Sequence, residues 1–398
     1  MAEVISPRSI DRNIYAFGLT SLLNDTASEM AYWVLPAFLA SIGAGPAQLG
    51  IIEGIAESVA SFAKLFSGYL ADRLPRRKPI VVAGYFVANA VKPVLAVATS
   101  WLHVLVIRFA DRLSKGIRGA PRDVMAAESS DKSRMGSTYG FIQAMDSAGA
   151  ILGPLIALLL LPHYGLRWIF WMAAIPGLLC ILVAAFGIRE TKRPAAPKLA
   201  IQGMTPWWRV PTLPGSFYLV LVAVTLFSLG NSSDMFLVLR AQNAGIPATH
   251  APLLGLVFNV AYTLLSWPAG YMSDKLSRPA VGAAGYLAFA AVYFVFAAAP
   301  STVAIWIAMA SYGFYYALTG PVLKALVVDT VAVEVRGRAL GIYFFVTSVG
   351  TLLASVITGE LWKYYGARVP FYLSATVALV SALLLLTVPR SRAGSENP

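Results

Sequence analysis

The sequence predicts an all-α polytopic membrane protein, with about twelve transmembrane helices in two pseudo-symmetric six-helix bundles. Of the 398 residues, 58% are hydrophobic and only 13% are charged, whereas a soluble chain usually carries roughly a quarter charged residues. Apolar runs of about 20 residues, long enough to cross a bilayer, recur from one end of the chain to the other. Similar motifs also recur in the two halves, which favours a duplicated architecture.

The predicted spans follow from apolar runs between turn signals, whose length fits helices rather than barrel strands. They cover residues 14–41, 47–70, 79–99, 101–125, 136–161, 167–188, 215–240, 250–272, 280–299, 302–328, 338–362 and 368–389. The first run is too long for a cleavable signal and contains Asp25 and Glu29, so we expect it to be a membrane span.

Lysine and arginine gather in every second connection between these spans. The even-numbered connections hold Arg73, Arg76, Arg77, Lys78, Lys132, Arg134, Arg189, Lys192, Arg193, Lys198, Arg209, Lys275, Arg278, Arg336 and Arg338. The positive-inside rule then predicts a multi-pass protein of the cell's inner (plasma) membrane with both termini cytoplasmic. The net charge of +12 is therefore mostly a topology signal, and we expect no nucleic-acid partner.

The longest connection, residues 189–214, is rich in proline and basic residues. It predicts a cytoplasmic linker between an N-terminal bundle at 1–188 and a C-terminal bundle at 215–398. Three correspondences support the duplication: GYLADRLPRR begins at Gly68 and GYMSDKLSRP at Gly270, RMGSTYG matches RGRALG, and Pro121 matches Pro321. All three have nearly the same offset, so the halves are expected to share one fold.

The loop after the second span resembles the signature loop of the major facilitator superfamily, usually G-x-L-a-D-r-x-G-r-k. The matching positions are Gly68, Asp72, Arg73, Arg76 and Arg77, and the second-half copy keeps Gly270, Asp274 and Arg278. Pro75 departs from the family's glycine. The resemblance implies the major facilitator fold, and it implies that Asp72 braces the cytoplasmic ends of helices from opposite halves when the transporter is open outward.

Several charges lie at membrane depth, where each costs on the order of 2.5–3.5 kcal/mol unless it pairs or lines a wet cavity. Arg108, Asp111, Arg112 and Lys115 follow i, i+3, i+4, i+7 spacing and form one polar face on the fourth span. Arg112 with Lys115 and Gly116 also resembles the family's R-x-x-q-G element. For Lys115, as for Glu53, Lys64 and Lys92, a structural ion-pair network is the favoured interpretation. 

The predicted proton-coupling residues are Asp25, Glu29, Arg112 and Asp146. Two desolvated carboxylates one helical turn apart should not both stay ionised, so one of Asp25 and Glu29 can hold a proton near neutral pH. The polar residues predicted to line a substrate cavity are Asn24, Arg108, Asp111, Gln143, Asn231 and Asp234.

The fifth span carries the spacing G-x8-G-x3-G-P at Gly140, Gly149, Gly153 and Pro154. This spacing resembles an element that marks antiporters in the superfamily, and small residues there permit close helix packing. The resemblance implies outward transport in exchange for protons, although the usual closing glycine pair is replaced by Ala157 and Leu158.

Three functions remain open at this point. The favoured one is a secondary active transporter, a monomer that exports a small amphiphilic molecule in exchange for protons by alternating access. The second is an uptake symporter for a metabolite or a metal-ion exporter. The third, a membrane-embedded enzyme, is disfavoured because the three histidines lie in separate connections and no nucleophile motif or nucleotide-binding loop occurs. We therefore expect no catalytic residue, no cofactor and no resident metal.

Overall fold

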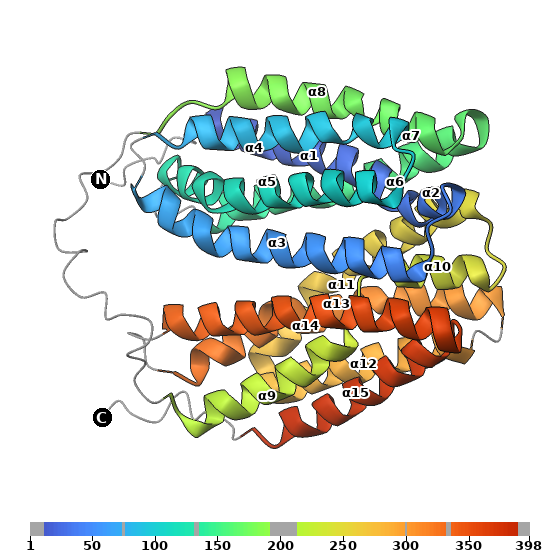
Figure 1. The fold of residues 1–398 in the computed structure, drawn as a ribbon. Helices are drawn as coiled ribbons and strands as arrows, with labels where there is room; N and C mark the ends of the chain where they lie inside the picture. Colours follow the sequence, from blue (N-terminus) through green and yellow to red (C-terminus); the bar gives the residue numbers. More distant parts are fainter. Residues whose placement is uncertain are drawn as a thin grey trace, which may run out of the picture. The chain divides into compact units, whose positions relative to one another are not determined.

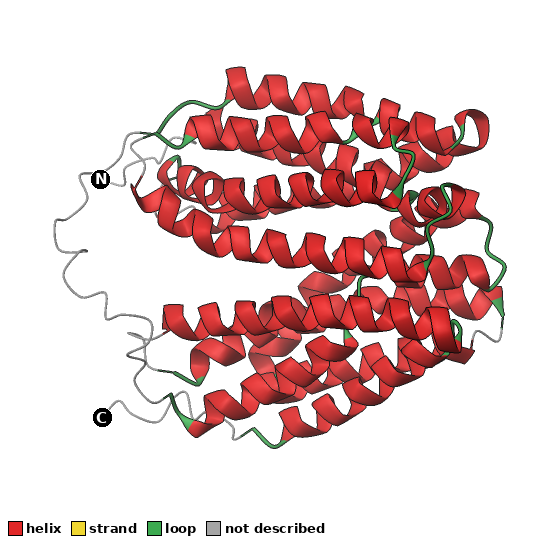
Figure 2. Ribbon diagram, viewed as in Figure 1, coloured by secondary structure: helices red, strands yellow, loops and turns green. Residues whose placement is uncertain are grey.

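The computed structural model describes residues 12–73, 76–130, 135–191, 213–298, 301–331 and 336–388. Within these ranges the chain forms helices joined by short connections and no strand, as Figure 2 shows. Backbone polar groups inside a bilayer must be paired within the protein, and helices satisfy this requirement locally. The predicted all-helical class is confirmed.

In the N-terminal half, helices occupy all six predicted spans (Figure 1). They are α1 (Arg12–Tyr32) and α2 (Leu35–Ser41), α3 (Pro46–Arg73), α4 (Lys78–Val91) and the 3-10 helix η1 (Pro93–Val97), α5 (Trp101–Glu128), α6 (Met135–Tyr164), and α7 (Leu166–Met172), α8 (Ala174–Leu182) and the π-helical turn η3 (Val183–Gly187). Prolines explain two of the interruptions, because Pro36 lies in the first turn of α2 and Pro93 begins η1.

The C-terminal half follows the same plan. It contains α9 (Gly215–Gly230) and α10 (Met235–Asn243), a 3-10 turn η5 (Ala248–His250), α11 (Ala251–Lys275), α12 (Arg278–Ala298), α13 (Thr302–Asp329), α14 (Arg336–Tyr365) and α15 (Val369–Leu386). The predicted seventh span is thus two helices, separated by the non-helical residues 231–234. A broken helix at membrane depth is a common feature of transporter binding sites.

Nine stretches of the described chain are long and apolar enough to cross a membrane. Three predicted spans fall outside these nine. They are the first, formed by α1 and α2 together, the second, formed by α3, and the fourth, formed by α5. These three spans carry acidic and basic side chains along their length. Their charges therefore lower the mean hydropathy, and the same charges form much of the site described below.

The helices group into two compact units. The first unit contains residues 1–32, 63–97 and 110–196, and the second contains 33–62, 98–109 and 197–398. In the first, α1 packs against α6 and α8, around a core that includes Phe17, Tyr85 and Cys180. In the second, α13 packs against α11 and α12, and α9 packs against α14 and α15. The predicted domain boundaries at 188 and 215 stay a prediction.

Candidate functional site

A chain of polar side chains joins α1 to α4 inside the first unit. Lys92 is 3% exposed, and its Nζ donates to Asn89 Oδ1 at 2.9 Å. Asn89 Nδ2 donates to Asn24 Oδ1 at 3.3 Å, and Asn24 Nδ2 donates to Asp25 Oδ1 at 2.9 Å. The buried Lys92 ammonium and the half-buried Asp25 carboxylate are therefore connected through two amides. The hydrogen bonds in such a chain polarise one another, so the charge at one end affects the bonding at the other.

Close packing of α6 against α1 brings a third titratable group near Asp25. A Cβ added to Gly149 would lie 2.5 Å from the carbonyl oxygen of Leu22, and one added to Gly153 would lie 2.7 Å from Glu29 Cβ. Only glycine fits so close a helix crossing. The crossing puts Asp146 of α6 within electrostatic range of Asp25.

Arg122 of α5 faces the same group of residues. Its Nη1 donates to Ser21 Oγ at 3.3 Å, its Nη2 pairs with Asp123 at 3.0 Å, and it interacts electrostatically with Asp146. The predicted residue Arg112 lies nearer the N-terminal end of α5 than Arg122, with its guanidinium carbon 5.9 Å from the ring centre of Tyr32. The first unit therefore brings the predicted carboxylates Asp25 and Asp146 together with a cation that the sequence did not single out.

Arg108 belongs to a different cluster, although it shares a helix face with Arg112. Its guanidinium donates three hydrogen bonds of 2.7–2.9 Å to Glu53 of α3. The side chains of Glu53 and Arg108 are 0% and 8% exposed. Ser233, in the break between α9 and α10, donates to Glu53 Oε2 at 3.3 Å and its backbone N–H donates to Ser355 Oγ at 3.1 Å. We call Glu53, Arg108, Ser233 and Ser355 the Glu53 junction.

Glycines allow α3 and α14 to meet beside the Glu53 junction, within the second unit. A Cβ added to Gly50 would lie 2.3 Å from the carbonyl oxygen of Ser355, and one added to Gly359 would lie 2.6 Å from that of Pro46. Ser58 Oγ also donates to the Ser348 carbonyl at 3.0 Å. Gly50 and Gly54 are spaced G-x3-G on α3, and this small-residue pair is the signal in the sequence that indicates the contact.

The broken helix places Asp234 against tyrosines of α13. Tyr312 donates to Asp234 Oδ1 at 2.7 Å and Tyr316 donates to Oδ2 at 3.0 Å. Asn231 Nδ2 donates to the Tyr315 hydroxyl at 3.3 Å. Phe258 packs edge-on against Tyr316, with ring centres 5.2 Å apart. The second unit therefore combines a carboxylate, an amide and aromatic faces, which suits a ligand that has both polar and apolar parts.

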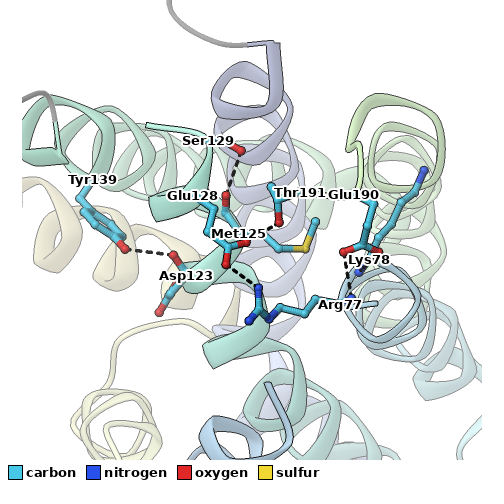
Figure 3. Close-up of polar contacts among 9 residues, drawn as sticks. All are labelled: Arg77, Lys78, Asp123, Met125, Glu128, Ser129, Tyr139, Glu190 and Thr191. Carbon is cyan, nitrogen blue, oxygen red and sulfur yellow. Dashed lines mark hydrogen bonds and ion pairs between the residues drawn. The ribbon is translucent and has the colours of Figure 1, made fainter. Parts of the chain in front are cut away.

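Another polar cluster ties the start of α4 to the end of α5 (Figure 3). Arg77 Nη1 pairs with Glu128 Oε1 at 2.7 Å, and Thr191 Oγ1 donates to Glu128 Oε2 at 2.5 Å. Glu190 accepts from the backbone N–H groups of Arg77 and Lys78, at 3.0 and 3.1 Å. A carboxylate at this position satisfies unpaired N–H groups and the positive end of the helix dipole.

The second half repeats part of this cluster. Arg278 at the start of α12 pairs with Asp329 at the end of α13. Both ion pairs join residues 51 positions apart, Arg77 with Glu128 and Arg278 with Asp329. The internal repeat could therefore have identified Glu128 and Asp329, which sequence reasoning missed.

Other predicted site residues have less structural context. Gln143 and Arg76 are exposed, whereas Pro154 is buried in α6, Glu29 is half-buried in α1 and Asp111 is half-buried in α5. The side chains at Asp72, Arg73 and Asp274, and the surroundings of Gly68, Gly140 and Gly270, lie outside the part that the structure describes. The assigned roles of all these residues stay predictions.

The helical fold, the broken span and the buried charge clusters define a polytopic transporter. A family model described as Major Facilitator Superfamily matches residues 17–239 and 220–398. An uncharacterized MFS-type transporter of Methanocaldococcus jannaschii is 33% identical over 389 residues, which cover 96% of each chain. The chain belongs to the major facilitator superfamily.

A more distant relative and two solved structures are also similar to this chain, the structures in fold. Multidrug resistance protein MdtG of Escherichia coli is 24% identical over 393 residues, covering 95% of this chain and 94% of MdtG. A mutant of the nucleoside transporter NupG has a TM-score of 0.79 at 14% identity, covering 94% and 99% of the two chains. A D-xylose–proton symporter has a TM-score of 0.74 at 16% identity, covering 96% and 98%. The predicted resemblance and fold are confirmed, and the protein is a membrane transporter rather than an enzyme.

Proposed function

We propose that this transporter exports a small amphiphilic molecule in exchange for protons, by alternating access. The observation that carries the proposal is the group of ionisable side chains inside the first unit, where Asp25 is linked to Lys92 and lies in electrostatic range of Asp146. Like charges held close together repel, so protonation of one carboxylate changes the electrostatic energy of its charged neighbours. Such coupling is what proton exchange requires.

Asp25, Glu29 and Asp146 are the proposed proton carriers, and Arg112 with Arg122 supplies the opposing positive charge. Glu29 and Asp25 lie on α1, which the glycines of α6 hold close to Asp146. Loss of a proton from one carboxylate strengthens its pairing with the arginines, whereas gain of a proton weakens it. Alternation between these two states supplies the conformational bias that a coupled transporter needs.

Asp234 and its tyrosines are the proposed contact for the polar part of the substrate. Tyr312 and Tyr316 can donate to a ligand oxygen in place of Asp234, while the ring of Phe258 offers apolar area. An uptake symporter for a metabolite is the second candidate, since one structural neighbour is a D-xylose–proton symporter. The kinship with MdtG, a multidrug resistance protein, and the glycine spacing of α6, which resembles the antiporter element, favour export.

The loop after α3 is the proposed gate at the cytoplasmic ends of the helices. We propose that Asp72 braces this end, and that the Arg77–Glu128 ion pair with Glu190 keeps α4 and α5 aligned with it. Asp72→Asn should then reduce transport strongly while expression stays near normal. Equal transport by Asp72→Asn and the wild type would leave Asp72 with a topological role only.

A growth-inhibition panel tests the function. Amphiphilic drugs, metal salts and metabolites are compared in a host that expresses the wild type, the Asp25→Asn variant or no transporter. Protection against amphiphilic compounds by the wild type, and not by Asp25→Asn, supports proton-coupled export. Increased sensitivity to a metabolite analogue would instead support uptake, and protection against metal salts alone would support a metal exporter.

A further inference from the structure

A cleft of about 530 Å³ lies in the second unit, where the end of α10 approaches the turn between α14 and α15. Arg240 and Asn243 line it from α10, and Tyr365, Arg368 and Val369 line it from the turn and the start of α15. None of the described residues that line the cleft is acidic. The cleft therefore concentrates two guanidinium groups with no countercharge from its own wall.

Arg240 also has a structural role. It is 4% exposed, its Nε donates to the Phe296 carbonyl at 2.8 Å, and its Nη2 donates to the Ala297 carbonyl at 3.2 Å. These are carbonyls at the end of α12, which need such partners. Its Nη1 donates to Asn243 at 2.8 Å. The network holds the guanidinium rigidly at the wall of the cleft, which reduces the entropy lost when a ligand binds.

The structural role of Arg240 does not explain Arg368. The Arg368 side chain is exposed, and it makes no hydrogen bond or ion pair with any part of the chain that the structure describes. It repels Arg240 electrostatically. Arg368 also precedes the first turn of α15, an 18-residue helix whose N-cap makes no side-chain hydrogen bond. An anion in the cleft would relieve the repulsion and meet the positive end of this helix.

The surroundings of the cleft indicate how such an anion arrives. Tyr364, Tyr365 and Tyr372 are 69%, 70% and 43% exposed, and Val369 is 40% exposed. Tyrosines with exposed rings are typical of the zone where lipid headgroups meet the acyl chains. Arginine binds phosphate oxygens through two parallel N–H groups.

We propose that the cleft between α10 and the α14–α15 turn binds a phosphate-type oxyanion through Arg240 and Arg368. The tyrosines around it favour a phosphate carried by an anionic phospholipid of the adjoining leaflet. The site is separate from the proposed transport residues, and it does not depend on the direction or the substrate of transport. 

Native mass spectrometry of the full-length protein tests the site with two probes, phosphatidylglycerol and inorganic phosphate. Phosphatidylcholine serves as the neutral lipid. Arg368→Gln removes one cation without disturbing the cap on α12. Lys363→Gln is the matched control, because Lys363 is exposed in the same region, with its Nζ 4.7 Å from the ring centre of Tyr364, but does not line the cleft.

The wild type and Lys363→Gln should retain phosphatidylglycerol in preference to phosphatidylcholine, and Arg368→Gln should bind it about tenfold more weakly. A second outcome is that the wild type binds both lipids equally, while inorganic phosphate raises the melting temperature of the wild type and not that of Arg368→Gln. In that case the oxyanion site is supported, with free phosphate as its ligand. Equal responses of the wild type and Arg368→Gln to both probes would overturn the proposal. So would an equal loss of binding in Lys363→Gln, because binding would then depend on surface charge alone.

Discussion

The Glu53 junction yields a quantitative prediction. Arg108→Met removes all three hydrogen bonds that Arg108 donates to Glu53, and leaves a carboxylate that is 0% exposed with Ser233 as its described partner. Removing one member of a buried ion pair costs about 3–5 kcal/mol, because the remaining charge is left without compensation. The variant should therefore lower the ratio of folded to unfolded protein by a factor on the order of 100 or more.

A double-mutant cycle separates this loss from simple changes in packing. Arg108→Met, Glu53→Gln and the double variant are unfolded reversibly in mixed micelles of increasing denaturing detergent, and the free energy of unfolding is measured. The free energy of unfolding lost in the double variant should be smaller than the sum of the two single losses by about 2 kcal/mol. Lys64 is an exposed residue on α3, the helix that carries Glu53. Lys64→Met should change the free energy of unfolding by less than about 0.5 kcal/mol. Additive single losses would refute a direct Glu53–Arg108 interaction.

The remaining predictions concern packing, charge geometry and topology. Gly153→Leu should destabilise the protein by about 1–3 kcal/mol, because the new side chain collides with α1. Gly119→Leu, whose added Cβ has no neighbour within 4 Å, should lower stability less when both variants are compared by thermal size-exclusion chromatography. Equal losses of stability would contradict the packing argument. Arg112→Lys keeps the charge but loses the planar guanidinium, so its transport rate should fall at normal expression; wild-type rates would contradict the role. Reporter fusions after Arg77 and after Arg193 should both report cytoplasm, and an outside signal from either would refute the topology.

The extent of the spans could be predicted from the sequence, because about 20 apolar residues between turns leave few alternatives to a membrane helix. The break between α9 and α10 could not, since residues 231–234 are too few to interrupt the apolar run around them. Their polar side chains, in LFSLGNSSDMF, were the available signal. The hydrogen bonds of Asp234 to tyrosines depend on the position of α13, which the local sequence does not specify.

Helical periodicity predicted a polar face on α5 but not the partners of its charges. Arg108 and Arg112 lie one turn apart, yet Arg108 binds Glu53 whereas Arg112 lies near Tyr32. Which partner each arginine meets depends on neighbouring helices, and spacing along one helix contains no such information. The sequence places Glu190 in the predicted linker 189–214, because a charge beyond the end of an apolar run resembles a solvated surface residue. Its carboxylate instead accepts from the backbone N–H of Arg77.

Proton-driven transport in proteoliposomes tests the central proposal most directly. A compound to which the wild type confers resistance is placed on both sides of the membrane at equal concentration, and a proton gradient is then imposed. The wild type should move the compound against its own gradient, whereas Asp25→Asn combined with Glu29→Gln should support only downhill exchange. Gradient-driven accumulation that persists in the double variant would contradict the assigned coupling residues, and its absence in the wild type would contradict proton coupling itself.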